Sequence, residues 1–159
     1  MIILKIRIAG IEKESVVDGE GIRYAVFMQG CSRNCKGCHN PSTHALDGGK
    51  VVDTQEIIDD IKKNPLLSGI TLTGGEPLLQ LDAAVELARE TKKLGLNVWC
   101  YTGYKFEEIP QKLLNVVDVV VDGAFVEELK DLTLNFRGSS NQRIIKLNYT
   151  EKKVAIKIL

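Results

Sequence analysis

Residues 69–77 of the chain are GITLTGGEP, a strand-forming segment that runs directly into a turn. Gly69–Thr73 predicts a short β-strand, and the two glycines and Pro77 after it predict a tight turn. Asp82 can then cap a helix with a regular apolar face, and Gly95 can end that helix. A strand, a turn and a helix in this order are typical of an α/β fold with a parallel sheet.

The same alternation continues on both sides of this unit. The other predicted elements are strands at Leu4–Ile8, Ile22–Met28, Asn97–Tyr101, Val116–Val121, Arg143–Leu147 and Val154–Leu159, and helices from Asp53 or Thr54 and over Phe106–Leu114. At roughly 30 residues per strand–helix unit, the chain has room for about five units, whereas a closed eight-unit barrel needs about 250 residues. We therefore predict one α/β domain over residues 1–159, an open partial barrel or small curved sheet.

Composition and charge narrow the classes of partner. Hydrophobic residues make up 44% and charged residues 26%, and Lys+Arg and Asp+Glu both number 21. Nucleic acid or an anionic membrane surface usually requires a basic excess, so neither is expected as a partner. The segment Met1–Ile8 alternates apolar and charged residues, unlike a signal peptide, and no apolar run is long enough to span a membrane. We expect a cytoplasmic protein, whose four cysteines are then metal or redox candidates rather than disulfides.

Three cysteines lie close together in a polar, irregular stretch after the second predicted strand. Cys31, Cys35 and Cys38 have the spacing C-x3-C-x2-C, and Gly30 and Gly37 allow the backbone to wrap around one metal centre. Electron-transfer clusters are normally held by four cysteines, so three leave one iron of a cubane cluster open. A catalytic site keeps such an open position for its substrate, as catalytic zinc does.

Other interpretations of these cysteines stay open at this point. Cys35–His39 matches the c-type haem motif C-x-x-C-H, although haem attachment normally follows export. His39 as a fourth ligand would give a closed structural zinc site. A thioredoxin-like pair of the last two cysteines would leave the first unexplained. Cys100 lies inside a predicted strand, where it is expected to be a small core residue rather than a fourth ligand.

Polar clusters follow four of the predicted strands. They are the cysteine loop after Met28, Gly74-Gly75-Glu76-Pro77 after Thr73, Thr102-Gly103 after Tyr101, and Asp122-Gly123 after Val121. Each cluster alone could be an ordinary turn or helix start. Because parallel α/β sheets bind ligands at the carboxyl ends of their strands, the joint placement indicates one site on one rim.

These motifs together resemble a known family. The three cysteines followed by Gly-Gly-Glu-Pro are similar to the radical S-adenosylmethionine superfamily, and Asp18–Arg23 and Cys38–Asn40 resemble its glycyl-radical-enzyme activases. Later motifs resemble the branch that acts on anaerobic ribonucleoside-triphosphate reductase, at Tyr101–Tyr104, Val119–Phe125 and Arg137–Arg143. The resemblance extends from about Ser15 to Leu147.

The resemblance implies an oxidoreductase with a 4Fe–4S cluster on Cys31, Cys35 and Cys38. The open iron would chelate the methionyl amino and carboxylate groups of S-adenosylmethionine. Reductive cleavage would give methionine and a 5′-deoxyadenosyl radical, which takes a hydrogen atom from a backbone glycine of the reductase large subunit. The implied electron donor is flavodoxin or a similar low-potential reductant. An activase of another glycyl radical enzyme, a small-molecule enzyme such as a deazapurine synthase, and a non-catalytic metal module remain alternatives.

The resemblance also assigns residues to S-adenosylmethionine. Glu76 and the backbone of Gly74 and Gly75 would hold the methionyl amino group, since carboxylate and carbonyl oxygens accept hydrogen bonds from an ammonium. Thr102 and Asp122 would line the ribose or methionyl side.

Two positions depart from the family pattern. Gly37 stands where many members have an aromatic residue over the adenine, and Glu20 stands where activases usually have proline. Arg23 and the loop of Arg137 are candidates for a surface that docks the partner, with a structural role as the alternative for each.

Overall fold

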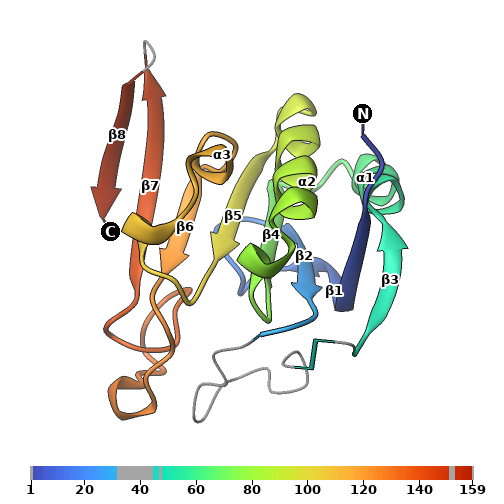
Figure 1. Ribbon diagram of the computed structural model, residues 1–159. Helices are drawn as coiled ribbons and strands as arrows, with labels where there is room; N and C mark the ends of the chain where they lie inside the picture. The colour runs from blue at the N-terminus through green and yellow to red at the C-terminus, as the bar shows by residue number, and fades with distance from the viewer. Residues whose placement is uncertain (1, 32–44, 47, 151–152, 159) are drawn as a thin grey trace.

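The computed structural model describes residues 2–31, 45–46, 48–150 and 153–158, and Figure 1 shows how their helices and strands are arranged. The strands are β1 (Lys5–Ser15), β2 (Arg23–Met28), β3 (Lys50–Asp53), β4 (Gly69–Gly74), β5 (Asn97–Tyr101), β6 (Val119–Asp122), β7 (Arg143–Thr150) and β8 (Lys153–Ile158). The helices are α1 (Thr54–Lys62), α2 (Leu81–Lys93) and α3 (Gln111–Leu114), with 3-10 turns η2 (Pro77–Gln80), η3 (Phe106–Glu108) and η4 (Glu127–Leu129). None of these helices is long and apolar enough to cross a membrane.

The described strands form one eight-stranded mixed sheet in the order β3-β1-β2-β4-β5-β6-β7-β8. The centre of the sheet is parallel, with β2, β4, β5 and β6 side by side. The edges are antiparallel, because β1 pairs with β2 and β3 on one side and β7 pairs with β6 and β8 on the other. The described sheet therefore differs from the predicted five strand–helix units. A period-two pattern marks a strand but does not say in which direction it pairs.

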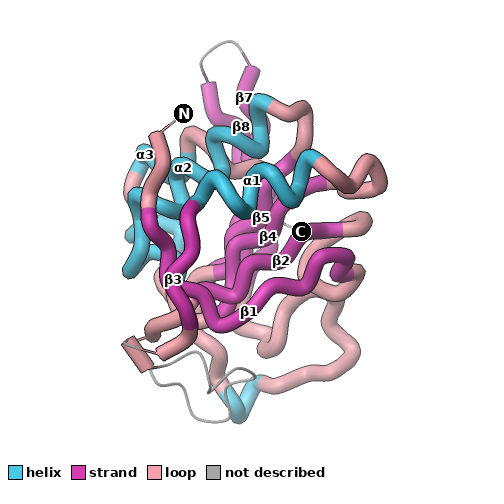
Figure 2. Tube along the Cα trace, turned by 90° about the vertical axis from the view of Figure 1, so that its right-hand side faces the viewer, coloured by secondary structure: helices cyan, strands magenta, loops and turns pink. Residues whose placement is uncertain are grey.

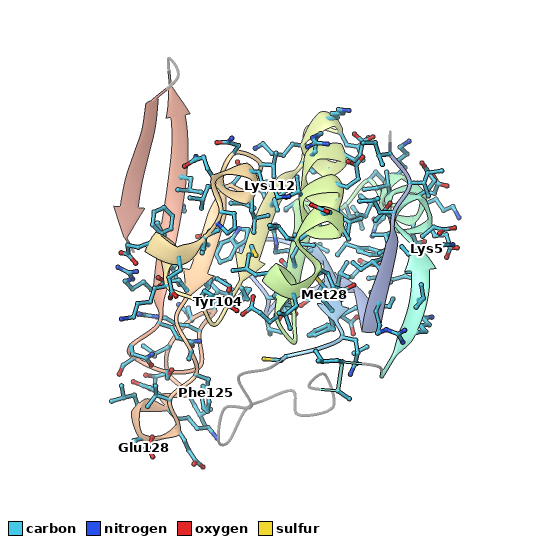
Figure 3. The ribbon with its side chains drawn as sticks, viewed as in Figure 1. Lys5, Met28, Tyr104, Lys112, Phe125 and Glu128 are labelled. Atoms are coloured by element: carbon cyan, nitrogen blue, oxygen red, sulfur yellow. The ribbon has the colours of Figure 1, made fainter. Side chains whose placement is uncertain are left out.

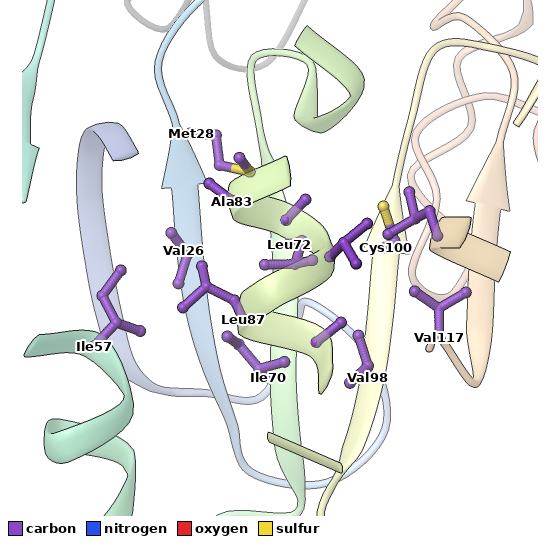
Figure 4. Packing of buried hydrophobic residues seen from close by; sticks show 14 of the residues in the cluster. Val26, Met28, Ile57, Ile70, Leu72, Ala83, Leu87, Val98, Cys100 and Val117 are labelled. Atoms are coloured by element: carbon purple, nitrogen blue, oxygen red, sulfur yellow. The ribbon is translucent and has the colours of Figure 1, made fainter. Parts of the chain in front are cut away.

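The main core lies between the sheet and the helices, which gather on one of its faces (Figure 2). Leu87 of α2 is fully buried against a sheet surface that includes Val26, Leu72 and Val98 (Figure 4). Each such side chain contributes about 1.5 to 3 kcal/mol when removed from water. The helix-covered face thus fixes the parallel strands, and their carboxyl ends form one rim.

Several element boundaries follow the predicted signals. Gly95 has φ +80° and ends α2, as predicted. Pro110 splits the predicted helix at 106–114 into η3 and α3, because proline cannot continue the helical hydrogen bonding. The strand β3 was not predicted, since its four residues merge into the start of α1.

Candidate functional site

A cavity of about 720 Å³ opens at the carboxyl ends of the parallel strands. Its described lining comes from the segments after β2, β4, β5 and β6, from the β1–β2 loop and from the long β6–β7 connection. Figure 3 shows this end of the molecule, with Tyr104 near the strand ends and Phe125 below them. Of the predicted site residues, the cavity brings together Cys31, Gly74, Gly75, Glu76 and Thr102.

Cys31 lies just beyond the end of β2, after Gln29 and Gly30, and is half-buried on the cavity wall. The turn after β4 holds the backbone that leads to it. Gly75 N donates a hydrogen bond to Met28 O at 2.8 Å, and Glu76 N donates to Gly30 O at 2.7 Å. The Gly-Gly-Glu-Pro turn and the start of the cysteine loop are therefore one braced unit. Cys35 and Cys38 lie outside the described residues, as do Gly37 and His39.

Position 74 requires a glycine because the ends of β2 and β4 approach each other closely there. Its φ is +105°, and a Cβ at this position would lie 2.4 Å from Met28 N and 2.6 Å from Met28 O. Both the backbone conformation and the space exclude a side chain. This contact sets the spacing between the β2 and β4 ends, and with it the spacing between Cys31 and the turn.

Glu76 joins the ends of β4 and β5 from within, since its side chain is only 2% exposed. Its carboxylate accepts hydrogen bonds from Thr102 Oγ1 at 2.8 Å, Gly103 N at 2.7 Å and Leu78 N at 3.1 Å. Thr102 Oγ1 in turn accepts from Tyr104 N at 3.1 Å. A carboxylate offers about four acceptor positions, so the described fold uses most of them. The structure thus places Glu76 as a brace behind the rim.

Asp122 is not among the described residues that line this cavity. Its buried carboxylate accepts hydrogen bonds from Phe106 N at 2.7 Å and from the guanidinium of Arg143. Arg143 also bonds Glu107, and these two carboxylates raise its pKa above the ordinary value. Asp122 therefore ties the β6 end to the η3 turn and to β7, apart from the other predicted site residues.

Arg23 is fully buried, so the prediction that it belongs to a docking surface is wrong. Its Nε donates to Thr71 Oγ1 at 2.7 Å, its Nη2 to Ile70 O at 2.7 Å and its Nη1 to the carbonyl of Glu20 at 3.0 Å. The guanidinium also lies 5.6 Å from the centre of the Trp99 ring. Burial lowers the pKa of Arg23 to about 10.

The turn at residues 18–22 is built around this arginine. Thr71 Oγ1 donates to Asp18 O at 2.6 Å, and a Cβ on Gly19 would come within 2.8 Å of both Arg23 and Trp99. Glu20 contributes its carbonyl to Arg23, while its own side chain is exposed. Although Glu20 stands where activases usually have proline, hydrogen bonds from Arg23 and Thr71 to backbone carbonyls hold the turn in place.

Cys100 is a core residue, as predicted. Its side chain is 0% exposed and packs on the helix-covered face of the sheet (Figure 4). Burial raises the pKa of its thiol, which disfavours the thiolate that a metal needs. It does not face the cavity and supplies no fourth ligand there.

The described charged side chains of the cavity are mostly acidic. Asp18, Glu76 and Asp131 line it, against Arg137 as the described cationic side chain. An acidic cavity favours a ligand that carries positive charge or none.

Sequence reasoning missed Tyr101 as a cavity residue. Tyr101 lines the cavity, and together with Phe136 it packs against a second apolar cluster around Trp99 on the face opposite the helices. Successive residues of a strand point to opposite faces of the sheet, so Tyr101 of β5 lies on the same face as Trp99 and on the opposite face from Cys100. This alternation could have placed Tyr101 on the cavity side.

Comparison with known proteins gives consistent results. Residues 17–145 match the family model described as a 4Fe-4S single cluster domain. Proteins named anaerobic ribonucleoside-triphosphate reductase-activating protein are 36% identical in Haemophilus influenzae and 40% identical in Vibrio cholerae, each covering 81% of this chain and 90% of the relative. The one from Escherichia coli K12 is 38% identical over 80% of this chain and 90% of its own length.

One solved structure shares the fold. QueE from Escherichia coli superposes with a TM-score of 0.51 at 15% sequence identity, covering 74% of this chain and 70% of that one. At this identity the likeness concerns the fold alone.

Proposed function

The chain belongs to the family of anaerobic ribonucleoside-triphosphate reductase-activating proteins, and on that premise we propose that it cleaves S-adenosylmethionine reductively to form the glycyl radical of the anaerobic reductase. The observation that carries the proposal is the position of Cys31. It lies on the same cavity wall as the Gly74–Glu76 turn and Thr102, and hydrogen bonds of that turn brace the backbone that precedes it.

The residues present fit both cofactors. Cysteine thiolates are the ordinary ligands of iron–sulfur clusters, and Cys31, with Cys35 and Cys38, would hold the 4Fe–4S cluster. The cavity volume lies within the usual range for small ligands of about 300 to 1,000 Å³. Its acidic lining suits S-adenosylmethionine, whose sulfonium and ammonium are both positive.

When bound, the cluster would supply one electron for the reductive cleavage of S-adenosylmethionine, and the hydrogen atom would be taken from a backbone glycine of the reductase large subunit. The protein's own residues would orient the bound cofactor and exclude water from it. Backbone carbonyls of Gly74 and Gly75 would accept hydrogen bonds from the methionyl ammonium, and the carboxylate of Glu76 would hold the same group through a remaining acceptor position and its negative charge. Thr102 would line the cofactor beside Glu76. Asp122 would act through the position of the β6 end, since its carboxylate is already paired.

The architecture of the sheet and the partners of the protein would be those of the superfamily. The sheet would be the open partial (β/α) barrel of a radical S-adenosylmethionine enzyme, which leaves an opening wide enough for a polypeptide loop. The reductase large subunit would be the protein substrate and flavodoxin or a similar reductant the electron donor, in the cytoplasm and without nucleic acid or membrane.

Anaerobic reconstitution tests the proposal. The protein with iron and sulfide, dithionite and S-adenosylmethionine should form 5′-deoxyadenosine. With the reductase large subunit added, an electron paramagnetic resonance doublet of a glycyl radical should appear. An intact cluster that yields no 5′-deoxyadenosine with the reductase present would refute the proposal. 5′-Deoxyadenosine without a glycyl radical would instead point to a small-molecule substrate.

A further inference from the structure

The hydroxyl oxygen of Tyr101 is a buried polar atom without a hydrogen-bond partner among the described residues, and its side chain lines the cavity. A buried hydroxyl without a partner is unfavourable and calls for an explanation. Burial and the negative charge of Asp18 raise its pKa, so the hydroxyl is protonated and can donate. Nothing in the proposed cleavage step uses this donor.

Arg137 presents a second donor of the same kind in the same cavity. Its Nε is buried and has no partner in the described part of the chain, while its Nη1 donates to Gln142 O at 2.8 Å. The neighbouring Phe136 has φ +60° and meets Trp99 edge-on, with ring centres 5.5 Å apart. Phe136 and Tyr101 pack on the same apolar cluster, which brings both donors to one region of the cavity.

The loop that carries Arg137 is held in place by its own side chains. Gln142 Oε1 accepts from Gly138 N at 2.8 Å and from Ser139 N at 3.1 Å, and Gln142 Nε2 donates to Gly123 O at 2.9 Å. Asn141 Nδ2 donates to Ala124 O at 2.8 Å. The arginine is therefore presented by a braced turn, which lowers the cost of ordering it on a ligand.

Tyr101 and Cys31 line the same cavity from the ends of strands that are not neighbours in the sheet. Cys31 follows β2, and β4 separates β2 from the β5 strand of Tyr101. At about 4.8 Å between neighbouring strands, the two strand ends are roughly 10 Å apart. Arg137 lies in the connection between β6 and β7, next to Phe136, whose ring contacts Trp99 of β5. A cofactor held by Cys31 and the Gly74–Glu76 turn would leave the part of the cavity lined by Tyr101 and Arg137 for another ligand.

The charges nearby identify the class of ligand. Asp18 and Asp131 line the cavity with the two donors and disfavour an anion. Two donors in an acidic setting suit neutral acceptor oxygens, and a polypeptide segment supplies these as backbone carbonyls.

We propose that Tyr101 and Arg137 form a subsite that binds backbone carbonyl oxygens of the polypeptide segment carrying the target glycine. Because both donor atoms are buried, binding is accompanied by small rotations of these two side chains. The subsite would hold the substrate segment in the same cavity as Cys31 and the Gly74–Glu76 turn. This inference rests on the proposed function, since it names the substrate-binding part of the same cavity.

The test compares two Tyr→Phe variants of the reconstituted protein. Tyr101→Phe removes a hydroxyl without a partner, whereas Tyr24→Phe removes one that donates to Asp60 Oδ2 at 2.7 Å, beneath α1 and away from the cavity. The dissociation constant for the reductase large subunit is measured anaerobically by calorimetry, and the melting temperature is measured for each variant. Tyr101→Phe should weaken reductase binding about tenfold while its melting temperature stays the same or rises. Tyr24→Phe should lower the melting temperature and leave reductase binding unchanged.

Arg137→Gln should also weaken reductase binding about tenfold. Unchanged reductase binding in Tyr101→Phe and Arg137→Gln would overturn the inference, and so would weaker binding of S-adenosylmethionine in place of the reductase. The readout is independent of cleavage. A wild-type protein that binds reductase through Tyr101 but forms no 5′-deoxyadenosine would refute the proposed function and leave the subsite standing.

Discussion

Glu76→Gln is the substitution whose cost follows most directly from the site geometry. From described residues the carboxylate accepts three hydrogen bonds at 2.7 to 3.1 Å, one from a hydroxyl and two from backbone N–H groups. Glutamine has one acceptor oxygen, so its NH₂ must face either Gly103 N or the pair formed by Thr102 Oγ1 and Leu78 N. At least one bond is lost, a donor faces a donor, and the remaining bonds change from charged to neutral. Bonds to charged groups contribute about 1.5 to 3 kcal/mol and neutral ones about 1, so the expected loss of stability is about 3 kcal/mol.

Urea unfolding followed by the fluorescence of Trp99, the single tryptophan, measures this loss. The midpoint should fall by about 1 to 3 M, given the usual dependence of stability on urea. Glu14→Gln, at an exposed position of β1, is the matched control and should leave the midpoint unchanged. A Glu76→Gln midpoint equal to that of the control would refute the view that this side chain braces the rim.

Three further predictions test other parts of the structure. Tyr24→Phe should destabilise the protein by about 1 kcal/mol at neutral pH. The hydrogen bond from Tyr24 holds the pKa of Asp60 below the ordinary 3.8, so the stabilisation is present above pH 3.8 and is lost as the pH falls through the pKa of the folded protein. The stabilities of the wild type and the variant should therefore converge in acid. Stability curves that stay parallel would contradict the assignment. Asp122→Asn should cost about 2 kcal/mol in urea unfolding, because the buried carboxylate accepts hydrogen bonds from Phe106 N and the Arg143 guanidinium and asparagine has one acceptor oxygen. The substitution Glu107→Gln, at an exposed partner of Arg143, should change little. Cys100→Ala should keep the iron and sulfide content of the wild type and lose about 1 kcal/mol of stability, because its side chain is buried in the core. Cys31→Ala should lose the cluster. Loss of iron in Cys100→Ala would mean that the buried thiol is a ligand.

The central strands were predictable because each is an apolar or β-branched run bounded by turn residues. Asn97–Tyr101 was placed with both its boundaries, and β4 differs from the prediction by one residue. The run Val116–Val121 was placed too early, since β6 begins at Val119. Val117 is buried in the turn before the strand, and burial alone produces the same apolar pattern as a strand.

The site could be predicted where the order of the strands determines the position of a residue. It could not be predicted where the position depends on which hydrogen-bond partner a side chain has in the folded protein. The carboxyl ends of parallel strands meet on one rim, so Cys31, the Gly74–Glu76 turn and Thr102 were placed together correctly. The pairing of Asp122 with Arg143 depends on the antiparallel register of β7, which the sequence pattern does not contain. The burial of Arg23 depends likewise on contacts with distant backbone carbonyls.

The account depends on an iron that three cysteines leave open for S-adenosylmethionine. Electron–nuclear double resonance of the anaerobically reduced cluster, with S-adenosylmethionine isotopically labelled in its amino and carboxylate groups, measures this directly. The account predicts hyperfine coupling from both labelled groups in the wild-type protein. A spectrum without coupling from either group, with cofactor in excess and the cluster intact, would show that the cofactor does not bind this iron and would contradict the proposed function.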